Sequence, residues 1–140
     1  MSEKTDDKKK QTQQKYLELQ LLDHQMSQAQ KQIQMLENQV AELDIVQQSL
    51  DSFATMKPGS ESFVTLTPGI FAKSELKDVK HVVVNIGAGV AVQKTIPETK
   101  MILATQSAEM RKLQEELTAQ LEKLAEKAEQ VEAELKKIIE

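Results

Sequence analysis

The hydrophobic positions of this chain form two long helical patterns, separated by a short segment of a different kind. The apolar side chains of residues 19–43 are spaced alternately three and four residues apart, and the same alternation returns in residues 121–138. The positions are Leu19, Leu22, Met26, Ala29, Ile33, Leu36, Val40 and Leu43 in the first pattern, and Leu121, Leu124, Ala128, Val131, Leu135 and Ile138 in the second. This spacing keeps one narrow apolar stripe on one side of a helix, as in the seam of a coiled coil.

The two patterns predict a mainly α fold, in which a long antiparallel intramolecular coiled coil has two β-hairpins at the junction of its helices. We expect a disordered N-terminus over residues 1–10, because that segment is charged and has no periodic apolar positions. The N-terminal coiled-coil helix should cover residues 11–56, and the C-terminal coiled-coil helix residues 96–140. Residues 57–95 should form the two β-hairpins and act as an oligomerisation module.

Each helical pattern contains one irregularity. After Leu43 the stripe continues at Val46, so a step of three stands where a step of four is expected. Such a step locally overwinds a coiled coil, and we favour the interpretation that the seam gives way there to packing against the strands. In the second pattern, two successive steps of four separate Leu113, Leu117 and Leu121. This stutter predicts local unwinding of the supercoil.

The boundaries of the helices carry their own signals. Pro58 should end the first helix, because proline cannot continue a helix and pushes the preceding residue out of the helical conformation. The sequence Thr95-Ile96-Pro97-Glu98 predicts a capping box at the start of the second helix. The Thr95 hydroxyl would accept a backbone N–H of the first turn, and Glu98 would reach back towards the cap.

Four short runs between the helices have the composition of β-strands, since β-branched residues dominate them and turn residues separate them. The runs are 63–66, 70–76, 81–86 and 90–94. The tight reversal at Gly87-Ala88-Gly89 predicts that the last two strands form a hairpin. One face of that hairpin would then carry Val82, Val84, Ile86, Val90 and Val92.

Strands this short cannot bury much apolar area on their own, and their open edges invite pairing with other chains. We therefore expect them to complete an intersubunit β-barrel with neighbouring subunits. The residues that we assign to this oligomer interface are Phe63, Val64, Leu66, Ile70, Phe71, Val82, Val84, Ile86, Val90 and Val92.

Composition narrows the classes of function. The chain has 140 residues, 29% of them charged and only 3% aromatic, as expected of solvated helices rather than a large globular core. It has no cysteine, which excludes disulfides and thiolate metal sites. Its net charge is −4, and charges of both signs are interspersed along the chain. This argues against a nucleic-acid partner, which would require a basic face. No run is apolar enough to span a membrane, and no signal segment begins the chain, so we expect a cytoplasmic protein.

No group of residues suggests catalysis or a cofactor. His24 and His81 lie in different predicted elements, whereas a metal site needs three or four converging ligands. The Gly87-Ala88-Gly89 turn lacks the third glycine and the following helix of a nucleotide-binding loop. Glutamates between Glu109 and Glu134 alternate with lysines, as on a solvated helix surface. We expect no enzyme, no cofactor and no metal.

The free ends of the two helices carry more apolar residues than a seam needs. Leu17, Leu21 and Ile139 fall outside the predicted stripe. Frayed ends could carry such residues by chance, but an antiparallel pairing would gather them into an exposed apolar patch that binds other proteins. We favour the patch, and the residues that we assign to contact with client proteins are Tyr16, Leu19, Leu22, Leu135, Ile138 and Ile139.

The layout, together with the sequence KDVKHVVVNIGAGVAVQKT from Lys77 to Thr95, resembles the alpha-class subunit of archaeal-type prefoldin. That class carries two β-hairpins between its helices, whereas the beta class carries one, and the four strand-like runs here match the alpha class. The similarity extends over nearly the whole chain from about Gln13. The helices contribute little to it, since any coiled coil would look similar, and the glycine turn with its flanks is more specific.

The resemblance implies a hexamer in which two alpha-class subunits join four prefoldin beta-class subunits through a double β-barrel. It implies an ATP-independent holdase that captures nonnative protein clients with the tips of its coiled coils and passes them to a group II chaperonin. The alternative is a structural coiled-coil scaffold that tethers a specific folded partner. A holdase would hold many unrelated unfolded proteins, whereas a scaffold would bind one folded protein and ignore denatured ones.

Overall fold

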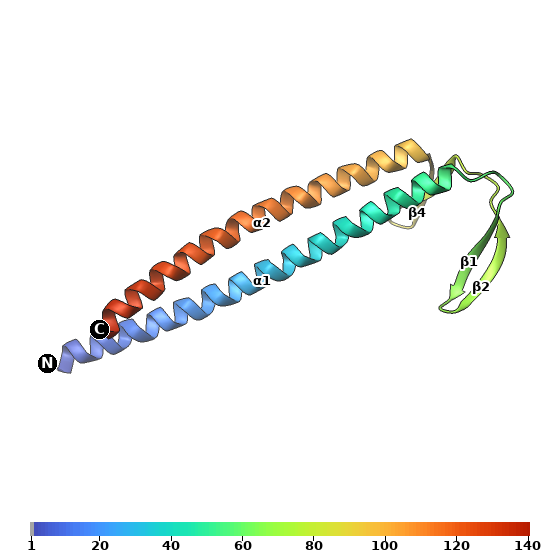
Figure 1. Cartoon of the computed structure of the whole chain (residues 1–140). Helices are drawn as coiled ribbons and strands as arrows, with labels where there is room; N and C mark the ends of the chain where they lie inside the picture. The colour runs from blue at the N-terminus through green and yellow to red at the C-terminus, as the bar shows by residue number, and fades with distance from the viewer. Residues whose placement is uncertain (1) are drawn as a thin grey trace. The chain divides into compact units, whose positions relative to one another are not determined.

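The computed structural model describes residues 2–140, with two β-hairpins between two long helices (Figure 1). The elements are α1 (Ser2–Ala54), β1 (Glu61–Thr67), β2 (Ile70–Glu75), β3 (His81–Gly87), β4 (Val90–Thr95) and α2 (Ile96–Ile139). The predicted fold class, a mainly helical chain with two antiparallel hairpins at the helix junction, is confirmed. By contact, the chain divides into two compact units.

The first unit contains the free ends of both helices, up to Gln39 in α1 and over Met110–Glu140 in α2. Its core is the predicted seam, in which Leu22, Ala128 and Val131 form a buried cluster. Leu19 and Leu124 pack against this cluster. An ion pair between Lys15 and Glu134, and a hydrogen bond from the Gln114 amide to Glu37 (3.2 Å), show that the helices run antiparallel here.

The start of α1 differs from the prediction. The helix begins at Ser2 rather than at Gln11, and residues 2–10, expected to be disordered, are helical and exposed; Met1 lies outside the described residues. Charge spacing favours this helix, because Asp6 and Lys10 stand one turn apart and Glu3 lies in the first turn. Because Lys15 lies opposite Glu134 and α2 ends soon afterwards at Ile139, the first turns of α1 continue past the last residues of α2 (Figure 1).

The two predicted irregularities of the seam are absent. Val46 is exposed, and the half-buried Gln47 takes the seam position between Leu43 and Leu50. Leu113 is likewise exposed, and the half-buried Gln114 precedes Leu117 in the seam. The alternation of three and four therefore continues through both places. Pairing fixes which side of each helix faces the other helix. A residue at a seam position therefore lies in the seam whether its side chain is polar or apolar.

The second unit, Val40–Glu109, contains the hairpins and the adjoining parts of both helices. β1 pairs antiparallel with β2, and β3 pairs antiparallel with β4, as two separate two-stranded sheets. The hairpin predicted for the last two strands is confirmed. Its two-residue turn has positive φ angles at Ala88 (52°) and Gly89 (74°), which matches the right-handed twist of the strands.

The start of α2 contains most of the predicted capping box. The Thr95 hydroxyl accepts the backbone N–H of Glu98 (3.2 Å) and donates to the Glu98 carboxylate (3.0 Å). Glu98 therefore reaches the hydroxyl of the cap rather than its backbone N–H. Thr95 is still the last residue of β4, opposite His81, so the cap joins the second hairpin directly to α2.

Removal of this cap should destabilise the junction between β4 and α2. We expect Thr95→Ala to lower the free energy of unfolding by about 1 kcal/mol, the usual cost of losing a hydroxyl cap. Thr95→Ser keeps the oxygen and should stay within a few tenths of a kcal/mol of the original chain. Denaturant unfolding followed by circular dichroism measures both. Equal losses for the two variants would contradict a capping role.

Candidate functional site

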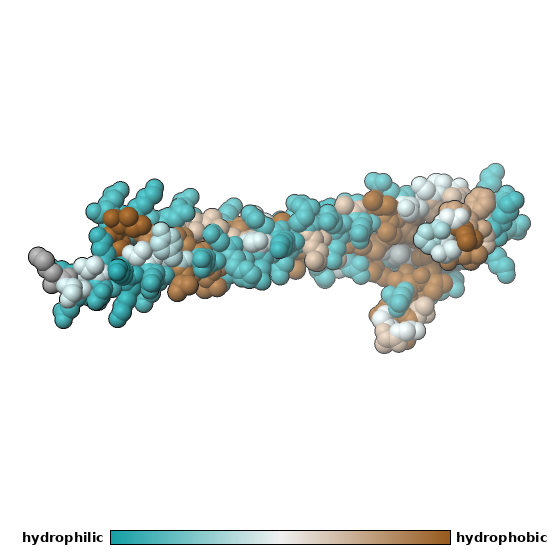
Figure 2. Space-filling model, turned by 90° about the horizontal axis from the view of Figure 1, so that it is seen from below, coloured by the Kyte–Doolittle hydropathy of each residue, from teal (hydrophilic) through white to brown (hydrophobic). Residues whose placement is uncertain are grey.

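The free end of the first unit exposes apolar side chains that the seam does not use. We call Tyr16, Leu17, Leu21 and Ile139, all of them exposed, the tip residues. Leu17 and Leu21 stand one turn apart, so they lie on one face of α1. Figure 2 shows apolar surface near the end where the chain begins, beside strongly hydrophilic surface. Such a surface is a candidate for contact with another protein.

The structure divides the six residues that we assigned to client contact. Tyr16 and Ile139 are exposed, and Ile138 is half-buried. The other three belong to the seam: Leu22 and Leu135 are buried, and Leu19 packs on the core cluster. While the helices stay paired, Leu22 and Leu135 are buried in the seam, and Leu19 is half-buried beside the core cluster. Their spacing of three and four residues already placed them in the stripe.

Sequence reasoning left Leu17 and Leu21 out of the assigned set, although both are exposed. Their exposure could have been predicted, because both residues fall outside the stripe and therefore have no partner in the seam. An apolar residue outside the seam of a two-helix coiled coil has nothing to cover it within the pair. For this reason the position relative to the stripe, rather than apolar character alone, identifies the accessible residues.

An ion pair fixes the two helices to each other beside the tip residues. The Lys15 ammonium contacts the Glu134 carboxylate across the seam and lies 3.8 Å from Glu18 on its own helix. The hydrogen bond and the negative charge of Glu134 raise the pKa of Lys15 above its ordinary value, so the lysine is fully charged at neutral pH. This pair lies where the end of α2 meets α1, beside the tip residues.

The second unit exposes a separate set of apolar residues, on the hairpins. In the β3–β4 hairpin Val84 lies directly opposite Val92. Because side chains alternate between the two faces of a strand, Val82 shares the face of Val84, and Val90 shares that of Val92. Ile86 lies at an irregularity of the register between Asn85 and Gly87. Val83 lies on the other face and is exposed. The apolar face predicted for this hairpin is therefore present in the register of the strands, with Lys94 opposite Val82 at its end.

The β1–β2 hairpin carries apolar residues on both faces. Val64 pairs with Ala72 on one face, while Phe63 and Phe71 lie on the other. The predicted interface residues of this hairpin are all exposed: Phe63, Val64, Leu66, Ile70 and Phe71. Figure 2 shows apolar surface over this part of the molecule as well. Within residues 2–140, the outer edge of each strand also lacks a pairing strand, which leaves backbone groups available to strands of other chains.

A local hydrogen-bond network holds the second hairpin at its base. The Asp78 carboxylate accepts the backbone N–H of Lys80 (2.7 Å) and of His81 (3.3 Å), and its second oxygen lies 2.8 Å from Nδ1 of His81. The Lys80 N–H and the His81 side chain lower the pKa of Asp78 below its ordinary value. His81 is thus engaged in fixing the start of β3.

The described residues offer no arrangement suited to metal chemistry. Within residues 2–140, no three or more His, Cys, Asp and Glu side chains come together as ligands for an ion. His24 is exposed on α1, and His81 belongs to the network around Asp78. Over the same residues, neither helix has a stretch both long and apolar enough to cross a membrane. The exposed apolar surfaces are therefore the features that need a functional explanation.

Two neighbouring leucines test the division between seam and tip. Leu22 is 4% exposed and Leu21 is 57% exposed. We expect Leu22→Ala to reduce the free energy of unfolding by about 2–4 kcal/mol, because it leaves a cavity in the seam. Leu21→Ala should change it by less than about 0.5 kcal/mol. Thermal and denaturant unfolding at 222 nm provide the measurement, and a larger loss for Leu21→Ala would refute the assignment.

The sequence and fold of the chain are similar to those of known proteins. The family model described as "Prefoldin subunit" matches residues 22–140. The chain is similar to prefoldin subunit alpha of Methanobrevibacter smithii, with 30% identity over 97 residues that cover 69% of this chain and 66% of that protein. It is similar to prefoldin subunit alpha of Archaeoglobus fulgidus, with 26% identity over 126 residues that cover 90% of this chain and 92% of that protein.

A eukaryotic relative and a solved structure extend the comparison. The chain is 29% identical to human prefoldin subunit 5 over 90 residues, which cover 59% of this chain and 56% of that protein. Its fold is similar to that of filamentous PFD from Methanocaldococcus jannaschii, solved by cryo-EM, with a TM-score of 0.78 and 18% sequence identity. That match covers 85% of this chain and 98% of the other. At this identity the structural match bears on the fold alone.

Proposed function

We propose that this chain, which belongs to the prefoldin family and to its alpha class, is one subunit of an ATP-independent holdase that binds nonnative proteins. Prefoldin is a chaperone family, and its subunits work as complexes. The observation that carries the proposal is the apolar surface that the seam leaves outside, at Tyr16, Leu17, Leu21 and Ile139. Exposed apolar residues at a free helix end suit contact with the apolar segments of unfolded chains.

Weak tips suit this task when several act together. One tip offers few apolar side chains, so its affinity for a client is low and release is fast. When several tips are joined in one complex, a client bound by one tip meets the others at high effective concentration, and the overall affinity rises without any new kind of contact. We propose that the chain obtains those additional tips by assembling with prefoldin beta-class subunits, two alpha with four beta.

Assembly would occur through the hairpins. The apolar face of the β3–β4 hairpin, the exposed residues of the β1–β2 hairpin and the unpaired strand edges support an intersubunit β-barrel. A barrel would pair those edges and bury those faces, which two strands cannot do alone. We further propose that the complex works in the cytoplasm and hands its clients to a group II chaperonin.

The tip residues should determine client binding without affecting assembly. In the complex with a beta-class partner, we expect Leu17→Ser combined with Leu21→Ser and Tyr16→Ser to weaken client binding roughly tenfold, through the apolar area that is lost. The measurement is light scattering after dilution of several unrelated denatured proteins, without ATP. Size-exclusion chromatography verifies that the complex stays assembled.

A matched control distinguishes the effect of the tip residues from that of any other exposed apolar residue. Leu113 is exposed on α2 and is not a tip residue, so Leu113→Ser should leave the suppression of aggregation unchanged, whereas Leu17→Ser alone should reduce it. If an assembled original complex fails to suppress scattering, or binds one folded protein only, the holdase proposal is wrong and the scaffold interpretation gains support.

The second hairpin allows a similar test of assembly. Val84 lies on the apolar face and Val83 on the opposite face of β3, and Val→Thr changes a methyl group to a hydroxyl at nearly constant volume. We expect Val84→Thr to shift the complex towards free subunits, because a hydroxyl without a partner in an apolar interface costs about 1–3 kcal/mol. Val83→Thr should assemble normally. Sedimentation velocity measures the assembled fraction, and equal behaviour of both variants would contradict the assigned face.

A further inference from the structure

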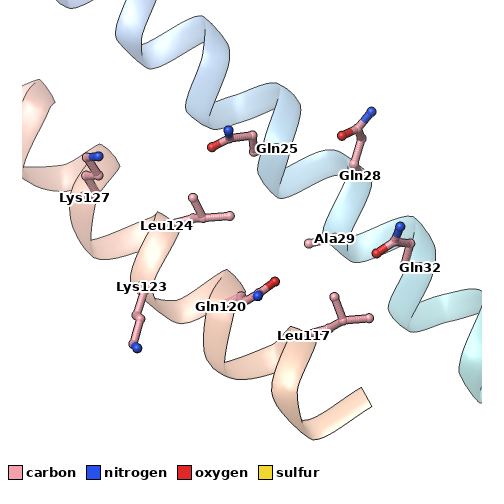
Figure 3. A pocket seen from close by; sticks show the side chains of 9 residues that line it. All are labelled: Gln25, Gln28, Ala29, Gln32, Leu117, Gln120, Lys123, Leu124 and Lys127. Carbon is pink, nitrogen blue, oxygen red and sulfur yellow. The ribbon is translucent and has the colours of Figure 1, made fainter. Parts of the chain in front are cut away.

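The first unit has a groove between its helices where the seam contains a small residue. Ala29 occupies a seam position, and its methyl group does not fill the space between α1 and α2. The groove has a volume of about 460 Å³, within the range of ligand-binding clefts. Figure 3 shows Ala29 of α1 facing Leu117 and Leu124 of α2 across it. These three residues give the groove an apolar floor.

Uncharged amides surround this floor. Gln25, Gln28 and Gln32 of α1 and Gln120 of α2 line the groove. In Figure 3 the side chains of Gln25 and Gln120 extend into the gap between the two helices. An amide side chain both donates and accepts hydrogen bonds, as a peptide group does. Four such side chains above an apolar floor are suited to an extended backbone that places an apolar side chain in the hollow.

The charges at the groove are of one sign. Lys123 and Lys127 line it from α2, and no carboxylate is among the residues that line it. Among the residues that line the groove, Lys123 and Lys127 therefore carry the charge, and it is positive. This favours segments in which acidic residues flank the apolar one, and disfavours segments flanked by lysine or arginine, although each exposed charge pair contributes little.

The groove is continuous with the tip along α1. Leu21, Gln25, Gln28, Gln32 and Met35 follow one another at steps of four, three, four and three residues, so they share one face of the helix. Leu21 is a tip residue, and Met35 is also exposed. A polypeptide bound at the tip can thus continue over the amides and reach another apolar residue on the same face.

We propose that this groove binds an extended segment of nonnative polypeptide whose apolar residue is flanked by aspartate or glutamate. The proposal rests on the holdase function and adds to it a second contact on the arm, with a charge preference that the tip residues do not supply. The apolar residue occupies the hollow over Ala29, the glutamines bond the backbone, and the lysines contact the flanking carboxylates.

The charge preference can be measured with two unstructured, fluorescein-labelled peptides. Each has one central leucine, flanked on both sides by glutamates in one peptide and by lysines in the other. By fluorescence anisotropy, we expect the full chain to bind the glutamate peptide about three- to tenfold more tightly, as two exposed charge pairs allow. The double variant Lys123→Glu and Lys127→Glu should reverse the preference.

The control for this experiment makes the same change of charge elsewhere on α2. Lys112 and Lys136 are exposed and do not line the groove. The double variant Lys112→Glu and Lys136→Glu should retain the preference of the original chain. Equal binding of the two peptides by the original chain, or an equal effect of both double variants, would overturn the proposal.

A photo-crosslinker in the groove can show directly whether a client or another copy of this chain binds there. In the assembled complex, we expect p-benzoylphenylalanine in place of Gln28 to crosslink to a denatured client. The same crosslinker in place of Gln30 should remain unreactive, since Gln30 is exposed but does not line the groove. A crosslink from Gln28 to another copy of this chain without client would show that a second copy occupies the groove, and would overturn the proposal.

The outcomes distinguish this proposal from the proposed function on which it rests. If the complex suppresses aggregation but Gln28 does not crosslink to the client, the groove proposal fails and the holdase function stands. If the complex does not suppress aggregation, the holdase function fails, whatever the peptides show. Suppression with a client crosslink at Gln28 and a preference for the glutamate peptide supports both.

Discussion

The limited width of the core is the constraint on which the other features of this chain depend. Two paired helices can cover only the row of side chains between them, and a two-stranded hairpin can cover even less. Among the described residues, no large side chain is completely buried. Every apolar residue beyond the single row must therefore stay exposed, or be covered by another molecule. The tip residues, the hairpin faces and the groove at Ala29 all follow from this limit.

The same constraint gives the exposed surfaces different roles. The hairpins combine apolar faces with unpaired backbone edges, and in the assembly that we propose, strands from other subunits would cover those faces and pair with those edges. Tyr16, Leu17 and Leu21 have no unpaired backbone groups, because they lie within α1, so their backbone does not require a pairing strand. A few apolar side chains on such a surface favour weak and reversible contact, which a protein that holds and then releases its clients requires.

The candidate site could be predicted from the sequence only in part. The free helix ends were identified correctly as rich in apolar residues, and Tyr16 and Ile139 are exposed there. The structure places Leu22 and Leu135 in the buried seam and packs Leu19 on its core cluster. The assignment to client contact counted apolar residues near the tip without removing those that the seam uses. Leu17 and Leu21 are exposed because they lie outside the seam, and their position relative to the stripe could have identified them.

The elements follow from local chemistry, because the alternation of apolar residues, the turn at Gly87-Ala88-Gly89 and the cap at Thr95 specify two helices and two hairpins. Which side chains fill the seam depends instead on how the two helices pair. Gln47 and Gln114 lie in it, whereas Val46 and Leu113 are exposed. The reason is that pairing fixes the rotation of a whole helix at once. A single apolar residue out of phase cannot turn the helix towards itself against all the others, and it stays in the solvent.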